Sequence, residues 1–199
     1  MDRVALFIDG SNFYHALKNA FGRASLKFDA LATVLTNRLP DRRLLRVYYY
    51  SAAYDQATNP ANYKSQQSFF GALRRTPYLS LSLGRLERRT IDWSGLDSQQ
   101  RSDVEKILGE PLPDYTHVEK GVDVQLAVDM VKFAVGNTYD VAIIISRDGD
   151  FAPAVEFVKS LGKHVELGRV TGSPCEQLRN ACDVTVEIDK QMLDPLWVQ

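Results

Sequence analysis

Two uninterrupted apolar runs, each leading into aspartates, constrain the fold of this chain more than any other feature. The segments "RVALFID" at residues 3–9 and "YDVAIIIS" at residues 139–146 each contain five successive apolar residues. A strand with one face in water alternates between apolar and polar residues, whereas a parallel strand with helices on both faces does not. We therefore expect both segments to be parallel strands in the middle of a sheet.

The rest of the chain alternates between strand-like and helix-like segments. Further strands are expected at residues 43–52, 78–89, 163–170 and 183–189. Helices are expected at residues 11–21, 28–39, 59–76, 121–137, 151–162 and 174–182. This alternation is typical of an α/β fold. It predicts a Rossmann-like three-layer sandwich, in which a mostly parallel central sheet has helices on both faces.

The length of the chain favours a single domain over residues 1–199. Residues 90–119 interrupt the alternation with two glycines and two prolines, and a short helix is expected at residues 97–108. We interpret residues 90–119 as an insertion rather than a domain boundary, because so short a segment cannot bury a core of its own. No element is predicted for the C-terminal tail at about residues 190–199.

Composition and charge indicate a soluble protein without a membrane partner. The net charge of -1 gives no overall basic signature of a nucleic-acid binder, although local patches matter more than totals. Cys175 and Cys182 form no Cys-x-x-Cys pair, and we expect them to be reduced and buried. The N-terminal apolar run is too short for a signal peptide, and no segment approaches the ~20 apolar residues of a membrane span. A cytoplasmic location is therefore expected.

Four aspartates are predicted to meet at one edge of this sheet. Asp9 ends the first apolar run, and Asp148 and Asp150 follow the run at residues 139–146. In parallel sheets the carboxyl ends of the strands share an edge, and ligands bind there. The helix at residues 121–137 runs antiparallel to the strand that it feeds, so its first turn, which contains Asp123, lies at the same edge.

Each aspartate taken alone has a simpler structural interpretation. Asp9 precedes Gly10 and suits a turn, and Asp123 near a helix N-terminus complements the macrodipole. Asp150 suits the N-cap of the helix at residues 151–162. Together, however, several carboxylates within a few ångströms repel one another until a proton or a cation relieves the repulsion. An all-carboxylate cluster without histidine suits Mg²⁺ or Mn²⁺.

The spacing of residues in this chain does not match other known types of acidic or phosphate-binding site. A haloacid-dehalogenase phosphatase requires a second aspartate where this chain has Ser11, and an integrin-type metal site requires a serine where it has Phe13. Neither a Walker A loop nor a Gly-x-Gly-x-x-Gly turn follows the first strand, so no nucleotide cofactor is expected.

Three motifs occur in order along the chain: "FIDGSN" at residues 7–12, "KGVDVQLAVDM" at 120–130 and "SRDGDFAP" at 146–153. Together they resemble the NYN domain, in its LabA-like group, within the PIN-like nuclease superfamily, and the resemblance spans roughly residues 3–170. It implies a PIN-like fold and a Mg²⁺- or Mn²⁺-dependent ribonuclease. The motif acids, which would hold the metal and act in catalysis, correspond to Asp9, Asp123, Asp148 and Asp150.

Other motif residues are expected to support these acids. The resemblance implies that Asn12 orients a carboxylate or touches the substrate, and we expect Ser146 and Arg147 to position the substrate. Arg147 stands where the family commonly has a small residue, so it either reaches a substrate phosphate or crowds the site. Asp129 matches a further family position, but six residues after Asp123 it is rotated by ~120° around the helix. We expect Asp129 either to support the site from behind or to form a salt bridge.

The predicted function is hydrolysis of RNA phosphodiester bonds by a metal held in the aspartate cluster. RNA, expected to be single-stranded, is the implied partner, and a homodimer is left open. The segment "LERR" at residues 86–89 is the densest group of candidate phosphate contacts, and its alternative interpretation is a solvated edge. Two rival functions remain open: a non-catalytic RNA-binding or regulatory module that retains the fold, and a structure-specific DNA nuclease.

Overall fold

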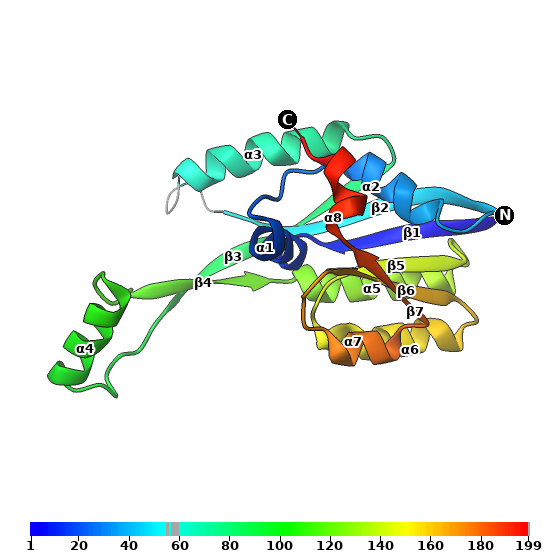
Figure 1. Cartoon of the computed structure of the whole chain (residues 1–199). Coiled ribbons are helices and arrows are strands. Elements are labelled where there is room, and N and C mark those ends of the chain that lie inside the picture. The colour runs from blue at the N-terminus through cyan, green and yellow to red at the C-terminus, as the bar shows by residue number, and fades with distance from the viewer. Residues whose placement is uncertain (55, 57–59, 199) are drawn as a thin grey trace.

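A seven-stranded sheet runs through the middle of the molecule in the order β4-β3-β2-β1-β5-β6-β7 (Figure 1). The computed structural model describes residues 1–54, 56 and 60–198. Within that part of the chain, every pair of neighbouring strands is parallel except β3 and β4. The strands are β1 (Asp2–Asp9), β2 (Arg42–Ala53), β3 (Leu79–Thr90), β4 (Tyr115–Lys120), β5 (Val141–Ile145), β6 (His164–Val170) and β7 (Val184–Ile188).

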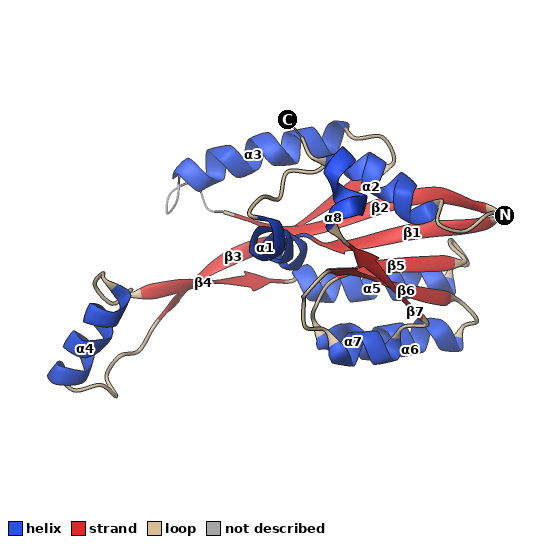
Figure 2. Cartoon of the chain, viewed as in Figure 1, coloured by secondary structure: helices blue, strands red, loops and turns tan. Residues whose placement is uncertain are grey.

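Helices cover both faces of the sheet (Figure 2). One face carries α1 (Gly10–Phe21), α2 (Phe28–Thr36), α3 (Pro60–Arg75) and α8 (Lys190–Leu193). The other carries α5 (Val122–Val135), α6 (Ala152–Ser160) and α7 (Glu176–Ala181). The expected start of α3 at residue 59 lies outside the described residues. The predicted α/β fold, with a mostly parallel sheet between two helical layers, is confirmed.

Successive residues of β1 belong alternately to two apolar cores, one under each helical layer. Leu6 and Ile8 pack in the core with α1 and α2, while Ala5 and Phe7 pack in the core with α5. All residues of Val4–Ile8 are fully buried, and β5 is buried along its whole length. Burying an Ile or Phe side chain stabilises a fold by roughly 1.5–3 kcal/mol. The continuous apolar run therefore holds β1 in the middle of the sheet.

Strands β3 and β4 extend away from the body and carry α4 (Ser98–Leu108) at their far end (Figure 1). The short helix predicted at residues 97–108 is present. Asp97 and Gln100 form a capping box at its start, and Gly109 ends it with a φ of 74°. Residues 115–120, at the end of the segment expected to be an insertion, form β4. Their strand partner lies far back in the sequence, and strand formation depends on such partners more than on local composition.

The C-terminal tail, for which the sequence predicts no element, folds onto the body as α8 and the short 3₁₀-helix η2 (Asp194–Leu196). The Asp189 side chain caps α8 by accepting a hydrogen bond from the Met192 N–H at 2.8 Å. Trp197 is only 7% exposed, with its ring 6.0 Å from that of Phe21 and 4.2 Å from the Arg23 guanidinium. A helix of four residues is too short to show apolar periodicity, which is why the sequence did not reveal it.

Both cysteines are free and buried, as predicted. Burial raises the pKa of the Cys182 thiol to about 12, so this thiol stays protonated at neutral pH. In the described part of the chain no helix has the length and apolar character needed to cross a membrane.

Candidate functional site

The four predicted aspartates lie at the carboxyl edge of the sheet. β1 and β5 are parallel neighbours that end together, so Asp9 and the loop with Asp148 and Asp150 leave the sheet side by side. The first turn of α5 contributes Asp123. Burial raises the pKa of Asp123, and repulsion from the other three aspartates raises it further. The structure therefore brings together acids from three separate segments, as their connectivity predicts.

Asp9 is held in place by three hydrogen bonds. Its Oδ2 accepts from Asn12 Nδ2 at 2.5 Å and from Ser146 Oγ at 2.8 Å, and its Oδ1 accepts from the Asn12 N–H at 3.1 Å. Only 1% of Asp9 is exposed. This burial raises its pKa against the lowering effect of the hydrogen bonds, and repulsion from Asp148 adds to the rise. Asp9 is also the N-cap of α1, so Asp9 and Gly10 begin a helix rather than the turn suggested by the sequence.

Asp148, rather than Asp150, has the helix-capping role. The Asp148 Oδ1 accepts a hydrogen bond from the Asp150 N–H at 2.9 Å and begins the 3₁₀-helix η1 (Gly149–Phe151), which precedes α6. The sequence-based alternative that placed this role on Asp150 is wrong, because the helical segment begins two residues earlier than expected. Asp150 is exposed and contributes to the repulsion acting on Asp123.

Glycine follows an aspartate at two places on this edge. A Cβ at Gly10 would lie 2.6 Å from the Tyr50 carbonyl oxygen, so only glycine lets α1 start so close to β2. A Cβ at Gly149 would overlap the Gln177 side chain of α7, which can move aside. Packing against backbone therefore requires glycine after Asp9 and does not require it after Asp148.

Asn12 connects Asp9 to Arg147. The Asn12 side chain donates to Asp9 through Nδ2 and accepts from Arg147 Nε at 3.2 Å through Oδ1. Ser146 acts similarly on the next loop, since its hydroxyl donates to Asp9 and accepts from the Asp148 N–H at 3.1 Å. The Arg147 side chain is thus held at the rim of the site by a polar partner. Its position beside Asn12 gives this arginine a defined place in the site.

Glu119 is a fifth acid at this edge that the sequence analysis missed. Burial raises its pKa, a hydrogen bond with Ser11 opposes the rise, and repulsion from Asp9 and Asp123 adds to it. Glu119 lies on β4, inside the segment expected to be an insertion. The available signal was the alternating segment "YTHVEK" just before the motif that contains Asp123. Gly121, with a φ of 80°, makes the turn from β4 into α5 and so places Glu119 near Asp123.

Asp129 contacts Tyr50, the residue of β2 that pairs with Asp9 in the sheet. Its Oδ2 accepts a hydrogen bond from the Tyr50 hydroxyl at 3.1 Å. Burial raises the pKa of Tyr50, and repulsion between its phenolate and Asp129 raises it further. In the described residues no cation pairs with Asp129 within salt-bridge distance, so the salt-bridge alternative is wrong. The bond from Tyr50 to Asp129 joins β2 to α5.

The five acids have the donor chemistry of a divalent cation site. Carboxylate oxygens are the ligands that Mg²⁺ and Mn²⁺ prefer. Burial raises the pKa values of Asp9, Glu119 and Asp123, and repulsion from neighbouring acids, which a cation would offset, adds to each rise. No three His, Cys, Asp or Glu side chains among the described residues form a ready coordination site. The residue types fit a hard cation, but the described side chains as placed do not form its coordination shell.

The family model of the NYN domain matches residues 3–189. The chain belongs to the NYN domain family. NYN domains are a PIN-like nuclease family, so the match confirms the resemblance carried by the three sequence motifs. The matched region also extends beyond residue 170, the end expected from the motifs, and reaches the last strand of the sheet.

The chain is similar to two further proteins, one in sequence and one in fold. The low amplitude and bright protein LabA of Synechococcus elongatus is 26% identical over 190 residues, which is 94% of this chain and 84% of LabA. A protein of unknown function from Vibrio parahaemolyticus RIMD 2210633, known from its crystal structure, superimposes with a TM-score of 0.63 at 20% identity and covers 96% of both chains. At that identity the structural likeness shows the shared fold alone.

Proposed function

We propose that this NYN domain is a metal-dependent ribonuclease that hydrolyses RNA phosphodiester bonds at the acidic edge. The observation that most supports the proposal is the gathering of Asp9, Glu119 and Asp123, from separate segments, at one edge, where burial and then repulsion from neighbouring acids raise their pKa values. Like charges gathered in this way destabilise a fold, and perturbed acids of this kind are concentrated at functional sites. The family assignment gives the reaction class.

Each acid and its neighbours have a distinct part in the proposed site. The residues that would hold Mg²⁺ or Mn²⁺ are Asp9, Glu119, Asp123, Asp148 and Asp150. When bound, such an ion stabilises negative charge on the phosphate and lowers the pKa of water. Asn12 and Ser146 hold the Asp9 carboxylate in one orientation, and burial of Asp9 keeps bulk water away from it.

Arg147 is proposed to position the substrate phosphate. A guanidinium is planar and always charged, and it recognises phosphate oxygens through two parallel N–H donors. Its Nε is engaged by Asn12, which fixes the plane of the group at the rim of the acidic edge. A phosphate held there would lie next to the acids, and the positive charge would offset their repulsion of RNA.

A cleavage assay tests the proposal. Single-stranded RNA is incubated with the protein in Mg²⁺ or Mn²⁺, and we expect cleavage that EDTA abolishes. Asp148→Asn should lower the rate by about 100-fold or more, because a carboxylate that would hold the metal ion is lost. Asp2→Asn is the matched control, since Asp2 is exposed at the opposite end of the strand that carries Asp9. Undiminished cleavage by Asp148→Asn would refute the site.

A non-catalytic RNA-binding or regulatory module is the second candidate. It is favoured by the hydrogen bonds that already engage both oxygens of Asp9. Metal-dependent RNA binding without cleavage would support it, whereas preferential cleavage of branched DNA would indicate a structure-specific DNA nuclease. Free, buried cysteines fit a reducing compartment, and we propose that the protein acts in the cytoplasm.

A further inference from the structure

A two-stranded ribbon leads away from the acidic edge. Residues 85–90 of β3 pair antiparallel with residues 115–120 of β4, and we call this pair the ribbon. Among the described residues, 86–90 pair with β4 alone, and the ribbon projects from the body as an arm (Figure 1). Its inner end, at Glu119 and Lys120, is joined through Gly121 to the helix that contains Asp123.

Basic and acidic residues are concentrated in different parts of the arm. The ribbon has two acidic residues and four basic ones, Arg85, Arg88, Arg89 and Lys120. The tip, residues 91–114, has two basic residues and six acidic ones, Asp92, Asp97, Asp103, Glu105, Glu110 and Asp114. A polyanion is therefore attracted to the ribbon and repelled by the tip. The net charge of the whole chain hides this contrast.

One face of the ribbon connects the acidic edge to a stacked arginine and tyrosine. Glu119 pairs with Leu86 and Tyr115 pairs with Thr90, so both side chains lie on the same face as Arg88. The Arg88 guanidinium lies 3.7 Å from the centre of the Tyr115 ring. From Glu119 to Tyr115 the strand advances about 13 Å, at roughly 3.3 Å per residue.

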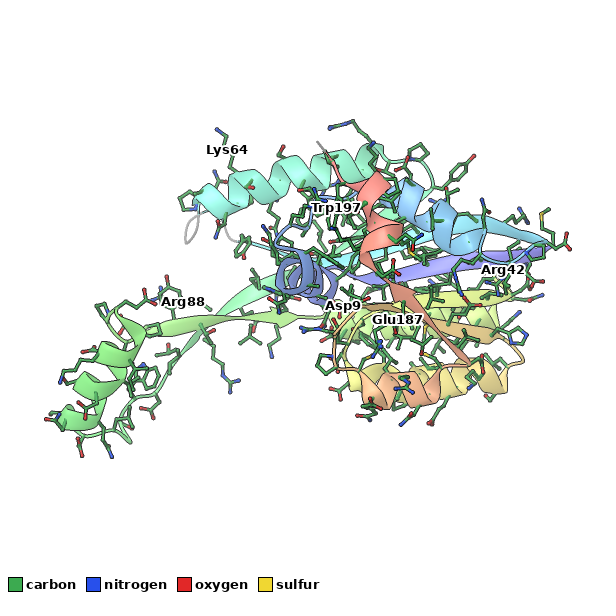
Figure 3. The ribbon with its side chains drawn as sticks, in the orientation of Figure 1. Asp9, Arg42, Lys64, Arg88, Glu187 and Trp197 are labelled. Carbon is green, nitrogen blue, oxygen red and sulfur yellow. The ribbon has the colours of Figure 1, made fainter. Side chains whose placement is uncertain are left out.

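The stacked pair has the chemistry that unpaired nucleotides require. Bases of single-stranded RNA stack on aromatic rings and on arginine guanidinium planes, and arginines contact the phosphates between them. Stacking on Tyr115 fixes the plane of the Arg88 guanidinium before any ligand arrives, which reduces the conformational entropy lost on binding. Figure 3 shows Arg88 on the arm and Asp9 in the body.

The opposite face of the ribbon adds positive charge. Arg85, Arg89 and Lys120 share that face by the same alternation of side chains. The Arg85 side chain is 78% exposed, and its guanidinium lies 2.7 Å from Glu87, which offsets part of its charge. Arg89 is exposed as well. These residues contribute to attraction of phosphates over several ångströms, whereas the stacked pair provides a defined contact.

We propose that the ribbon is a binding surface for single-stranded RNA, with Arg88 and Tyr115 as its main contact. The strand runs from the acidic edge past Glu119 to the stacked pair, and the acidic tip keeps it from extending onto α4. The choice of RNA as the ligand rests on the proposed function. The ribbon itself is assigned from its charge, its register and its position beside Asp123.

Fluorescence anisotropy with a labelled 16-nucleotide polyuridine RNA tests the assignment. Binding is measured in EDTA, so that no cleavage is needed. We expect Arg88→Gln to weaken binding about fivefold and to reduce the slope of log affinity against log salt by about 0.7, the value for one phosphate contact on a single strand. Arg88→Lys keeps the charge and loses the plane, so it should weaken binding and leave the salt slope unchanged.

Two further variants separate a local contact from overall charge. The double variant Arg88→Gln/Arg89→Gln should weaken binding more than Arg88→Gln. Lys106→Gln/Arg179→Gln is the matched control, because it removes the same charge from two exposed positions, one on α4 and one on α7. Equal weakening in the control pair would refute the ribbon assignment. Circular dichroism confirms that each variant is folded, and Tyr115→Leu, expected to weaken binding about threefold or more, tests the stacked pair independently.

The outcomes also distinguish this inference from the proposed nuclease. Ribbon-dependent binding by a wild-type protein that cleaves nothing would support the ribbon and reject the nuclease. Cleavage by the wild type, with unchanged binding in both Arg88 variants, would reject the ribbon alone. If these variants bind RNA normally but convert a dimer to a monomer in light scattering, the ribbon is a protein interface and its assignment to RNA is wrong.

Discussion

The two ends of the sheet treat acidic side chains in opposite ways. Near the amino ends of the strands, the Arg3 guanidinium donates two hydrogen bonds of 2.7 and 2.9 Å to Asp140, and its backbone N–H donates a third. The Arg42 guanidinium lies 2.6 Å from Glu166. At the carboxyl edge five acids gather, and none of them has an ion-pair partner among the described residues. The amino end is therefore neutralised within the chain, while the carboxyl edge retains negative charge.

The same side-chain type responds in opposite directions at the two ends. Hydrogen bonds from Arg3 hold the pKa of Asp140 well below its usual range. Burial and repulsion raise the pKa of Asp123. A paired acid favours the folded state, whereas a repelled acid opposes it and gains from any ligand that brings positive charge. The contrast separates charges that hold the fold together from charges that prepare a site.

The largest expected effect is at the amino end. Glu166 and Arg42 have side chains only 5% and 7% exposed, so Glu166→Gln leaves a buried guanidinium without its counter-ion. We expect the free energy of unfolding to fall by about 3 kcal/mol, measured by urea denaturation. Glu187→Gln, at a position labelled in Figure 3, is the matched control. The Glu187 side chain is 41% exposed and pairs with Arg169. A loss below about 1 kcal/mol is expected there. Equal losses of unfolding free energy in Glu166→Gln and Glu187→Gln would contradict the view that the buried pair contributes more to the fold than the exposed one.

At the carboxyl edge, divalent cations should stabilise the fold. Mg²⁺ or Mn²⁺ that binds the folded acids raises the free energy of unfolding by about 1.4 kcal/mol at ten times its dissociation constant. The melting temperature of the wild type should therefore rise with MgCl₂, compared with NaCl of equal ionic strength. This rise in melting temperature should be smaller in Asp148→Asn than in the wild type. In Asp2→Asn it should equal that of the wild type. No difference between the two salts would contradict a cation site.

A smaller effect is expected for Asp140→Asn, which lowers the melting temperature by about 2 °C at pH 7, because both partners of this ion pair are partly exposed. The folded pKa of Asp140 is lowered, so its contribution is present above the ordinary aspartate pKa of about 3.9 and is lost as the pH falls through the folded value. The gap between wild type and variant should therefore close below about pH 4. A difference in melting temperature that grows as the pH falls would contradict a stabilising ion pair between Arg3 and Asp140.

The smallest effect should have the opposite sign. Asp123→Asn removes a repelled charge, so we expect it to stabilise the protein at pH 7 by a few tenths of a kcal/mol, a value limited by solvent screening. The folded pKa of Asp123 is raised, so its destabilising effect disappears as the pH falls through that value and the carboxyl takes up a proton. Calorimetry between pH 7 and 4 should show the two proteins converge. Destabilisation by Asp123→Asn at pH 7 would show that this acid is paired.

The acids that follow strands were predictable because connectivity alone places them. The first apolar run is a buried strand, the second leads into Asp148, and a helix feeding a parallel strand must start at the same edge, which locates Asp123. Glu119 could not be found in this way. Its position depends on the antiparallel pairing of β3 with β4, and an excursion of residues 91–114 separates the two strands. The choice between Asp148 and Asp150 as a cap depends on one turn of 3₁₀-helix.

The sequence also could not show which charged side chains form ion pairs. Glu166 is one of many glutamates in the composition, and only the packing of β6 near the start of β2 shows that it faces Arg42. The basic segment at residues 86–89 was visible, but its two interpretations, phosphate contact or solvated edge, could not be separated. The structure shows instead that this segment stands clear of the body on a ribbon, next to an acidic tip.

The turn at Gly121 joins the arm to the acidic edge. β4 and α5 are separated by this single residue, whose φ of 80° sets the angle between them. The arm is also joined to the body by β3, which runs without a break from the sheet into the ribbon. Glu119 and Asp123 lie on either side of the glycine, only four residues apart along the chain. The geometry of one turn therefore sets how far apart two of the five acids stand.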